Sequence, residues 1–399
     1  MAQPIRKKIQ EIHPDVIKER EERTLLVDGT ALLFMSFKDA TVNSDGVHIG
    51  GIFQFLLQLK MMIAKFKPTY VYVFFDNEYS GWLRWQLYHD YKANRDKHYE
   101  DYVSNASEYM KEYEKRLKNM QNYLFNKNKP KKREKSEWDE FVDANFDRER
   151  DTLIKYFEEL YVRSYMDEIV EADDLISYYC QNKEKSEKII IMTADMDLTQ
   201  LIADDIAIYD LHNKIFITPK NFTEKFGYYY ENTFVKKVFC GDVSDNIGNI
   251  RGLSESGFYN LMPEAKERLV TIDEVKERAR ELVNERVENK KKPLKVHENI
   301  INGVSNKTYD GDFYEINSKI IDLKHPILTD DAKETMDGMI HAPIDPDGRS
   351  FQNLYSYIID DNIDVLKSGE KFSSFFSTFK KIEDIEKKRF EEYLKTQRI

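Results

Sequence analysis

The stretch KIIIMTADMD at residues 188–197 places two aspartates directly after an apolar run that contains three isoleucines. Such a run is typical of a strand that is buried on both faces of a sheet. Two earlier runs end in the same way, TLLVD at 24–28 and YVYVFFD at 70–76. Strands that alternate with helices indicate an α/β fold with a mostly parallel central sheet flanked by helices.

The α/β pattern extends from residue 24 to about residue 218. The predicted strands are 24–28, 69–75, 161–166, 188–193 and 205–210. The predicted helices are 50–66, 78–90, 147–160, a segment from 171, and 195–203. We therefore predict an N-terminal extension over 1–23, an α/β domain over 24–218 and a helical C-terminal domain over 219–399.

A basic segment interrupts the α/β pattern, and we interpret residues 98–140 as an insertion over the sheet. Between Lys111 and Lys135, ten Lys and Arg outnumber three Glu, which gives +7 within a chain of net charge −11. Such a run is usually a solvated loop, but inside an α/β domain it favours an element that holds phosphates. The predicted nucleic-acid contacts in this segment are Lys127, Lys129, Lys131, Lys132 and Arg133.

Composition excludes several classes of protein. Hydrophobic residues make up 41% of the 399 residues, which is enough for a large core. The two cysteines, Cys180 and Cys240, have no zinc-binding spacing and indicate a reducing, cytoplasmic compartment. No apolar run reaches the roughly 18 residues of a membrane span, and the N-terminus lacks the apolar centre of a signal peptide.

Acidic residues gather where the predicted strands end and where helices begin. These carboxylates are Asp28, Asp76, Glu171, Asp173, Asp174, Asp195, Asp197, Asp242 and Asp245. Each motif alone could be a helix N-cap, but parallel strands share one edge where ligands bind. Carboxylates crowded there would repel each other unless cations bind, and an all-oxygen ligand set favours Mg²⁺ or Mn²⁺. The set therefore predicts two-metal phosphodiester hydrolysis.

Two further motifs could contact nucleic acid. The first contains three cations that could hold a scissile phosphate or could only neutralise the acids, namely Arg84, Lys92 and Arg95. Tyr91 lies beside them in the sequence and could stack on an unpaired base. The segment GDVSDNIGNIRGLSESGF at 241–258 has the pattern of a helix–turn–helix joint. Its glycines, Gly248 and Gly252 among them, allow either an ordinary turn or a backbone site for a DNA phosphate and a monovalent cation.

These motifs occur together in one family. DGT, FFD, YKANR, EADDL, TADMDLTQL and GDVSDN stand here in the order found in the 5′-to-3′ exonuclease and flap endonuclease family. The segment DNEYSGWLR at 76–84 is most similar to the phage ribonuclease H branch of that family. The resemblance covers about residues 20–262. It implies a PIN-like 5′-nuclease fold, an arch at 98–140 and a helix–turn–helix DNA-binding motif near 241–262.

The resemblance also implies roles for individual residues. It places one metal near Asp28, Asp76, Glu171, Asp173 and Asp174, and a second near Asp197, Asp242 and Asp245, with Asp195 close to both. It makes Lys92 and Arg95 the catalytic cations of the active site and Tyr91 a base-stacking residue. One departure is NIRGLS at 249–254, which replaces the family's GVxGIG and has no glycine at position 254.

The implied function is Mg²⁺-dependent cleavage of RNA or DNA from the 5′ end of flapped or nicked duplexes, as in RNA primer removal during phage DNA replication. Ribonuclease H activity on RNA–DNA hybrids belongs to this expectation. The expected partners are DNA, RNA–DNA hybrids, and a single-strand-binding protein or sliding clamp, for a monomer in the host cytoplasm. Two alternatives stay open: a PIN-type ribonuclease and a structure-specific DNA-binding module with decayed catalysis.

Overall fold

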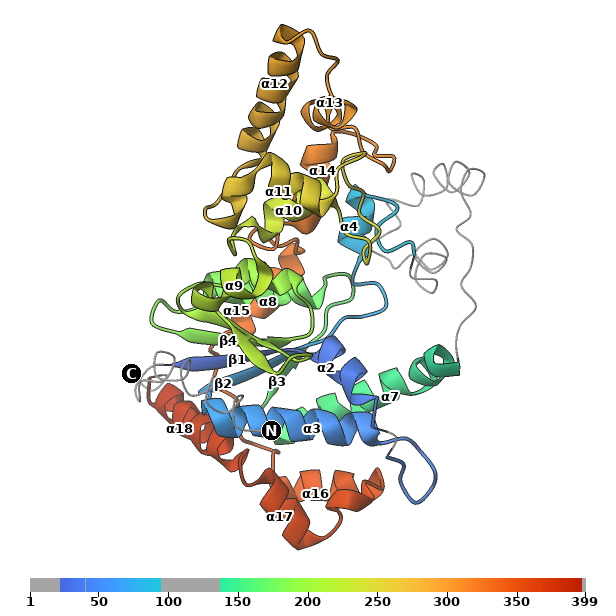
Figure 1. Cartoon of the computed structure of the whole chain (residues 1–399). Helices are drawn as coiled ribbons and strands as arrows, with labels where there is room; N and C mark the ends of the chain where they lie inside the picture. Colours follow the sequence, from blue (N-terminus) through green and yellow to red (C-terminus); the bar gives the residue numbers. More distant parts are fainter. Residues whose placement is uncertain (1–21, 40, 95–136, 397–399) are drawn as a thin grey trace, which may run out of the picture.

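The computed structural model describes residues 22–39, 41–94 and 137–396. At its centre lies a six-stranded sheet in the order β3-β2-β1-β4-β5-β6 (Figure 1). The strands are β1 (Arg23–Asp28), β2 (Tyr70–Phe74), β3 (Arg163–Tyr165), β4 (Lys188–Thr193), β5 (Ile206–Asp210) and β6 (Ile215–Ile217). Neighbouring strands from β3 to β5 are parallel, and β6 runs antiparallel to β5. The mostly parallel sheet is confirmed, whereas the three-residue strand β6 was not predicted.

The register of the sheet brings its acids to one edge. Val27 of β1 lies level with Val73 of β2 and with Met192 of β4. Asp28, Asp76 and Asp195 stand at or just after the ends of these three strands. Because the strands are parallel, the three acids leave the sheet on the same side, as predicted.

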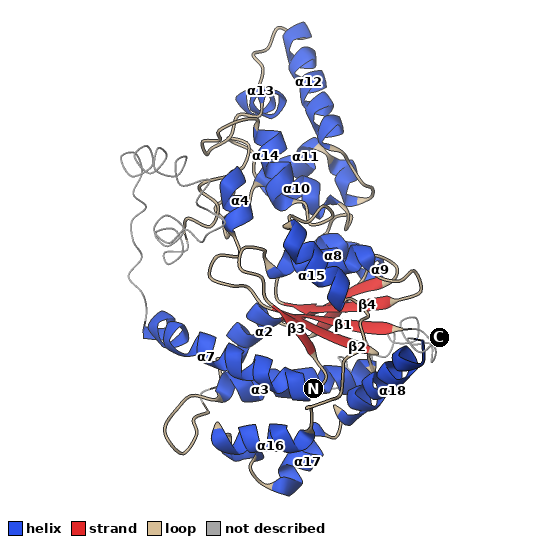
Figure 2. Ribbon diagram, turned by 180° about the vertical axis from the view of Figure 1, so that it is seen from behind, coloured by secondary structure: helices blue, strands red, loops and turns tan. Residues whose placement is uncertain are grey.

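Helices cover both faces of the sheet (Figure 2). Alternate side chains of β1 point to opposite faces, so Leu25 and Val27 join one core and Leu26 joins the other. The first face is covered by α2 (Gly29–Ser36), α3 (Gly50–Phe66) and α7 (Glu137–Glu159). The second face is covered by α8 (Ala172–Asn182), α9 (Pro219–Phe226) and α15 (Asp330–Met339).

A third core lies beside the acidic edge of the sheet. Its helices are α4 (Trp82–Leu87), α10 (Asn232–Cys240), α11 (Glu255–Leu261), η3 (Pro263–Lys266), α12 (Ile272–Glu288), α13 (Lys295–Asn302) and α14 (Phe313–Ile321). Figure 1 shows these helices stacked above the sheet. The turn between α10 and α11 corresponds to the predicted helix–turn–helix joint.

The last helices return to the first face of the sheet. They are α16 (Phe351–Asp360), η4 (Asp364–Leu366), α17 (Gly369–Phe376) and α18 (Lys380–Thr396). A buried ion pair fastens α18, since Arg163 donates to both oxygens of Glu386 over 2.8 and 3.0 Å. Residues 219–399 therefore contribute to three cores and do not pack as the single helical domain that the sequence predicted. We propose that the separate helical unit spans about residues 232–321.

Two predicted boundaries also differ from the structure. α7 begins at Glu137, so the last four residues of the predicted insertion belong to this helix, and residues 98–136 lie outside the described residues. The predicted helix at 195–203 is a short 3-10 helix, η2 (Asp197–Leu201). In the described part of the chain, no helix is both long enough and apolar enough to cross a bilayer.

Candidate active site and metal centre

Hydrogen bonds fix Asp28 and Asp76 at the ends of β1 and β2. Asp28 caps α2 by accepting from Ala31 N over 2.9 Å, and its other oxygen accepts from Thr193 Oγ1 over 2.7 Å. Asp76 Oδ1 accepts from Ala172 N at the start of α8 over 2.9 Å. Three strands and the helix α8 therefore meet at these two carboxylates.

Asp173 and Asp195 belong with Asp28 and Asp76 to a first acid group. Burial raises the pKa of Asp28 to about 7, and the charges of Asp76 and Asp195 add to the shift. Burial also raises the pKa of Asp173 well above its ordinary value, with further contributions from the other three acids. The four carboxylates are close enough to repel one another, so a bound cation would stabilise their ionised forms.

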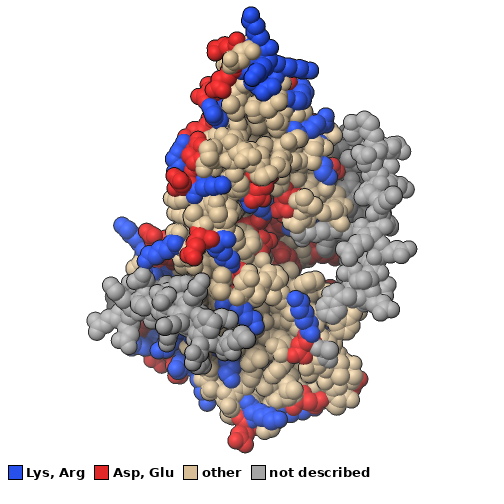
Figure 3. Space-filling model, viewed as in Figure 1, with Lys and Arg blue, Asp and Glu red and all other residues tan. Residues whose placement is uncertain are grey.

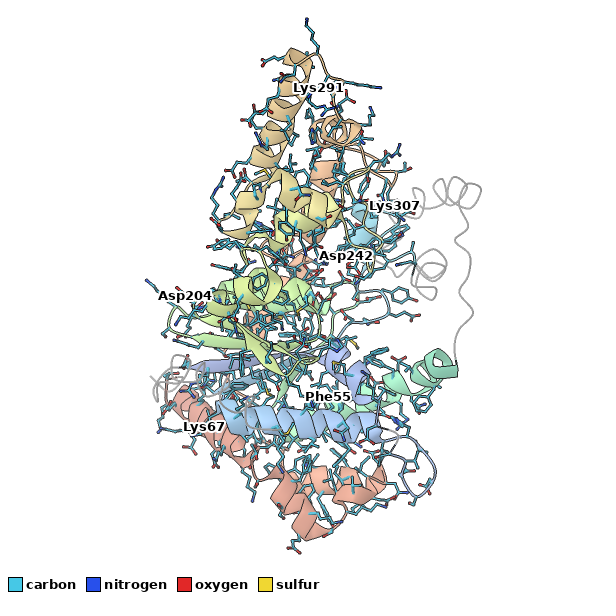
Figure 4. All side chains as sticks on the ribbon, in the orientation of Figure 1. Phe55, Lys67, Asp204, Asp242, Lys291 and Lys307 are labelled. Carbon is cyan, nitrogen blue, oxygen red and sulfur yellow. The ribbon has the colours of Figure 1, made fainter. Side chains whose placement is uncertain are left out.

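Asp197, Asp242 and Asp245 form a second acid group. Each offers one carboxylate oxygen, and these oxygens lie within 4.8 Å of one another. Asp197 opens η2, whereas Asp242 and Asp245 lie in the turn that follows α10. Figure 3 shows acidic side chains in the hollow between the sheet and the helices above it, and Figure 4 places Asp242 at that level. The structure thus brings together the three acids that the resemblance assigned to one metal.

Lys237 of α10 was not found by the sequence analysis, although it touches the second acid group directly. Its ammonium group forms ion pairs with Asp197 and with Asp242. Burial raises the pKa of Asp197 to about 7, and Asp195 adds to the shift while Lys237 opposes it. At Asp242, Lys237 and Ser244 outweigh burial and lower the pKa to about 2. A lysine shortly before Asp242 was visible in the sequence, but nothing there shows that it points inward.

Arg84 is buried, with 4% of its surface exposed, so the predicted contact with nucleic acid is wrong. Its guanidinium group donates to Asp174 over 3.0 Å, to Glu171 over 2.5 Å and to Ile320 O over 2.8 Å. Asp174 also accepts from Ile327 N over 2.9 Å. These contacts engage both oxygens of Asp174, which anchors α4 and residue 327 to α8, and its role as a metal ligand stays a prediction.

Glu171 lies among cationic and hydroxyl partners. Lys92 forms an ion pair with it, and Tyr91 Oη donates to it over 3.0 Å. Lys92 and Arg84 outweigh burial and lower the pKa of Glu171 to about 2. Tyr91 is 4% exposed and belongs to the third core, so the predicted stacking on a base is wrong. The side chain of Lys92 keeps 22% of its surface exposed, which leaves it accessible to a phosphate.

Backbone contacts join the YKANR segment to the turn of the second acid group. Lys92 N donates to Asp245 O over 2.9 Å, and Asn94 Nδ2 donates to Val243 O over 2.9 Å. Lys92 therefore lies beside Glu171 and next to the second acid group at once. The remaining predicted cations lie outside the described residues: Arg95, Lys127, Lys129, Lys131, Lys132 and Arg133.

Gly248 and Gly252 differ in the turn between α10 and α11. Gly248 is buried and its N–H donates to Tyr309 Oη over 2.9 Å, so the prediction that it contacts nucleic acid is wrong. A Cβ at this position would lie 2.7 Å from Ser305 Oγ, which explains the glycine. Gly252 is exposed and has a φ of +84°, a conformation that favours glycine, and its contact with a phosphate stays a prediction.

The chemistry of the two acid groups fits hard divalent cations. Both groups consist of carboxylates, the ligands that Mg²⁺ and Mn²⁺ prefer, and in the second group three carboxylate oxygens lie within 4.8 Å of one another. In the first group, burial and mutual repulsion raise the pKa values of the acids. In the second group, a lysine already supplies a positive charge to two carboxylates. Each group therefore has the charge and the donor atoms to hold a divalent ion.

Comparison with known proteins places the chain in a family. Residues 23–227 match the family described as 5'-3' exonuclease, N-terminal resolvase-like domain. The chain is 27% identical over 264 residues to DNA polymerase I of Bacillus subtilis, a match that covers 64% of this chain and a quarter (25%) of the polymerase. It is 26% identical over 265 residues to a 5'-3' exonuclease of the same organism, covering 64% of this chain and 73% of that protein.

Solved structures were compared as well. The T5 5'-exonuclease with bound zinc has 15% identity and a TM-score of 0.48, covering 92% of this chain and 100% of that one. The catalytic core of Rad2 in complex with a DNA substrate has 12% identity and a TM-score of 0.43, covering 90% of this chain and 93% of that one. On the family match, which spans more than half of its length, the chain belongs to the 5'-3' exonuclease family with an N-terminal resolvase-like domain.

Proposed function

We propose that this protein is a 5′ nuclease that requires two divalent ions and removes RNA or DNA from the 5′ ends of flapped or nicked duplexes. The observation that supports this most is that Asp197, beside the sheet, meets Asp242 and Asp245 of the turn after α10, with Lys92 next to that turn. The first ion is assigned to Asp28, Asp76, Asp173 and Asp195, with Glu171 nearby. The second ion is assigned to Asp197, Asp242 and Asp245. Mg²⁺ is the proposed metal, and Mn²⁺ would substitute for it.

The residues around these groups suggest a division of labour. Bound divalent ions would activate a water molecule and stabilise charge on the phosphate. Lys92 would hold the scissile phosphate, and its ion pair with Glu171 keeps its ammonium group at the acidic edge. Thr193 and the Ala31 amide orient the two oxygens of Asp28, which limits the positions that this carboxylate can take.

The finer parts of the function follow the family resemblance. We propose duplex binding at the turn between α10 and α11, where Gly252 exposes its backbone, with a monovalent cation at this turn. The basic insertion would hold the 5′ single strand, and Arg95 would act with Lys92. RNA primer removal in phage-type replication, ribonuclease H activity, a clamp or single-strand-binding partner, a monomeric state and a cytoplasmic location belong to the same proposal.

A cleavage assay on 5′-labelled substrates tests the proposal directly. Flapped, nicked and single-stranded DNA, and an RNA–DNA hybrid, are incubated with the protein with and without Mg²⁺. We expect release of short 5′ products from the flap and the nick, and only when metal is present. Cleavage of single-stranded RNA without a preference for flaps would favour a PIN-type ribonuclease. Tight flap binding without cleavage in Mg²⁺ or Mn²⁺ would favour a binding module.

A further inference from the structure

Lys237 takes the place of a cation within the second acid group. Its ammonium group contacts Asp197 and Asp242, and these carboxylates with Asp245 have oxygens within 4.8 Å of one another. The lysine side chain is 15% exposed. A metal ion that used both Asp197 and Asp242 would need the same space and the same oxygen lone pairs as the ammonium group.

The backbone of Lys237 is fixed, whereas its side chain can move. The next two residues of α10, Val238 and Phe239, are fully buried in the third core, so the helix is held in place. A lysine carries its charge on a flexible four-carbon chain. The ammonium group can therefore leave the two carboxylates by rotation of the side chain, without movement of the helix.

We propose that Lys237 is a built-in competitor for the second metal ion. In the metal-free protein its ammonium group holds Asp197 and Asp242 together, and it leaves before a divalent ion binds both. The charge keeps the acids in position, and it also lowers the affinity of the second ion, because like charges repel. This inference rests on the proposed second metal site and is independent of the substrate and of cleavage.

The competition concerns one of the two proposed ions. In the ranges that the structure describes, neither Asp28 nor Asp173 forms an ion pair with a lysine or an arginine. Burial raises the pKa of Asp76 and the charge of Lys92 opposes this shift, but Lys92 forms its ion pair with Glu171. Removal of the charge at position 237 should therefore change one step of metal binding and leave the other step unaltered.

Mn²⁺ binding in the absence of nucleic acid tests the proposal, with free Mn²⁺ measured by electron paramagnetic resonance. Lys237→Met removes the charge and keeps a side chain of similar length. We expect one of two binding steps to tighten by about tenfold or more. Lys236→Met is the matched control, since Lys236 lies on the same helix, 3.5 Å from the exposed Glu255. This control should bind Mn²⁺ like the unmodified protein, and so should Lys237→Arg, which keeps the charge.

Thermal unfolding gives a second measurement. Without metal, Lys237→Met should melt at a lower temperature than the unmodified protein, and saturating Mn²⁺ should raise its melting temperature by more. If Lys237→Met does not fold without metal, Lys237→Gln replaces it with the same expectations. An unchanged or weaker binding step in the neutral variant would overturn the proposal.

Failure of the wider function gives a different result. Binding of a single Mn²⁺ by every variant would refute the two-ion site itself. Two binding steps, one of them sensitive to Lys237→Met, together with no cleavage of any flap, would refute the proposed nuclease activity and leave the role of Lys237 supported.

Discussion

Replacing Arg84 with methionine should destabilise the protein strongly, because the buried Asp174 would lose its ion pair with Arg84 and the buried Glu171 would lose one of its two cationic partners. Arg84, Glu171 and Asp174 are 4%, 5% and 1% exposed. Glu171 keeps its ion pair with Lys92, whereas Asp174 keeps the hydrogen bond from Ile327 N. Removing one partner of a buried ion pair costs about 3–5 kcal/mol. We therefore expect the free energy of unfolding to fall by about 3 kcal/mol or more.

Urea unfolding followed by circular dichroism measures this loss. The control is Arg268→Met, since Arg268 forms an ion pair with Glu274 in which both side chains are more than 40% exposed. Such an exposed pair contributes at most about 1 kcal/mol. A double variant, Arg84→Met with Asp174→Leu, should recover part of the lost stability, because apolar residues often replace a buried pair without cost.

Two results would refute this reasoning. Stability close to that of the unmodified protein, with weakened binding to a labelled flap, would mean that Arg84 contacts nucleic acid after all. A double variant no more stable than Arg84→Met would show that the unpaired charge of Asp174 is not the cause of the loss.

Four other perturbations have measurable outcomes. EDTA should abolish flap cleavage, and added Mg²⁺ should restore it. Asp76→Asn should abolish cleavage while flap binding is retained. Near-normal turnover of this variant would mean that the site is misplaced. Lys92→Ala should slow single-turnover cleavage by roughly 100-fold with a smaller loss of affinity, while equal losses would make it a general phosphate contact. Burial opposes protonation of His48, but Glu149 and Asp39 O outweigh it and raise its pKa. Protonated His48 therefore stabilises the folded protein fully below the ordinary pKa of histidine, and this stabilisation is lost as the pH rises through the raised pKa. In His48→Gln, the free energy of unfolding should therefore decline less between about pH 6 and 8. An unchanged pH dependence in urea would contradict that role.

The acidic edge could be predicted because its signals are local. An apolar run and the acid that ends it are adjacent in the sequence, as at Asp28 and Asp76. Parallel pairing then places such acids on one side without any knowledge of side-chain contacts. Asp242 and Asp245 follow no predicted strand, and only the family resemblance assigned them to the site, because their position depends on how the third core packs against the sheet.

The directions in which the side chains of Arg84 and Lys237 point could not be predicted from the sequence in the same way. α4 has six residues, too few to show a hydrophobic stripe that marks its inner face. The partners of Arg84 lie 90 positions away at Asp174 and 236 positions away at Ile320. A basic residue near a predicted acidic site suggests a phosphate contact, but only the packed structure shows that its charge is used internally.

Sequence patterns also could not predict which part of the protein the C-terminal helices pack against. α18 has an amphipathic sequence, and its buried Ile382 and Glu386 face the sheet domain. The partner of Glu386 is Arg163, which lies 223 positions earlier in the chain. Helical periodicity shows that α18 must cover a surface, whereas this distant pair decides which surface it covers.

Contacts between two short segments hold the turn of the second acid group against the YKANR segment. Tyr88 Oη donates to Asn246 O over 3.2 Å, and Asn246 Nδ2 donates to Asp90 O over 2.7 Å. The bond from Lys92 N to Asp245 O adds a third link between the same segments. The position of the turn therefore depends on Tyr88, Asp90 and Asn246 as well as on its acids.

The backbone at this joint is held in an unusual conformation. Asn246 has a φ of +58° and Lys92 a φ of +54°, both in the left-handed region that residues other than glycine rarely adopt. Such conformations persist where the surrounding structure over-determines them, and here the cross-links between the segments do so. These cross-links fix the turn that carries Asp242 and Asp245 against the segment that carries Lys92. Because Lys92 also forms an ion pair with Glu171, the second acid group and Glu171 are held on either side of the same lysine.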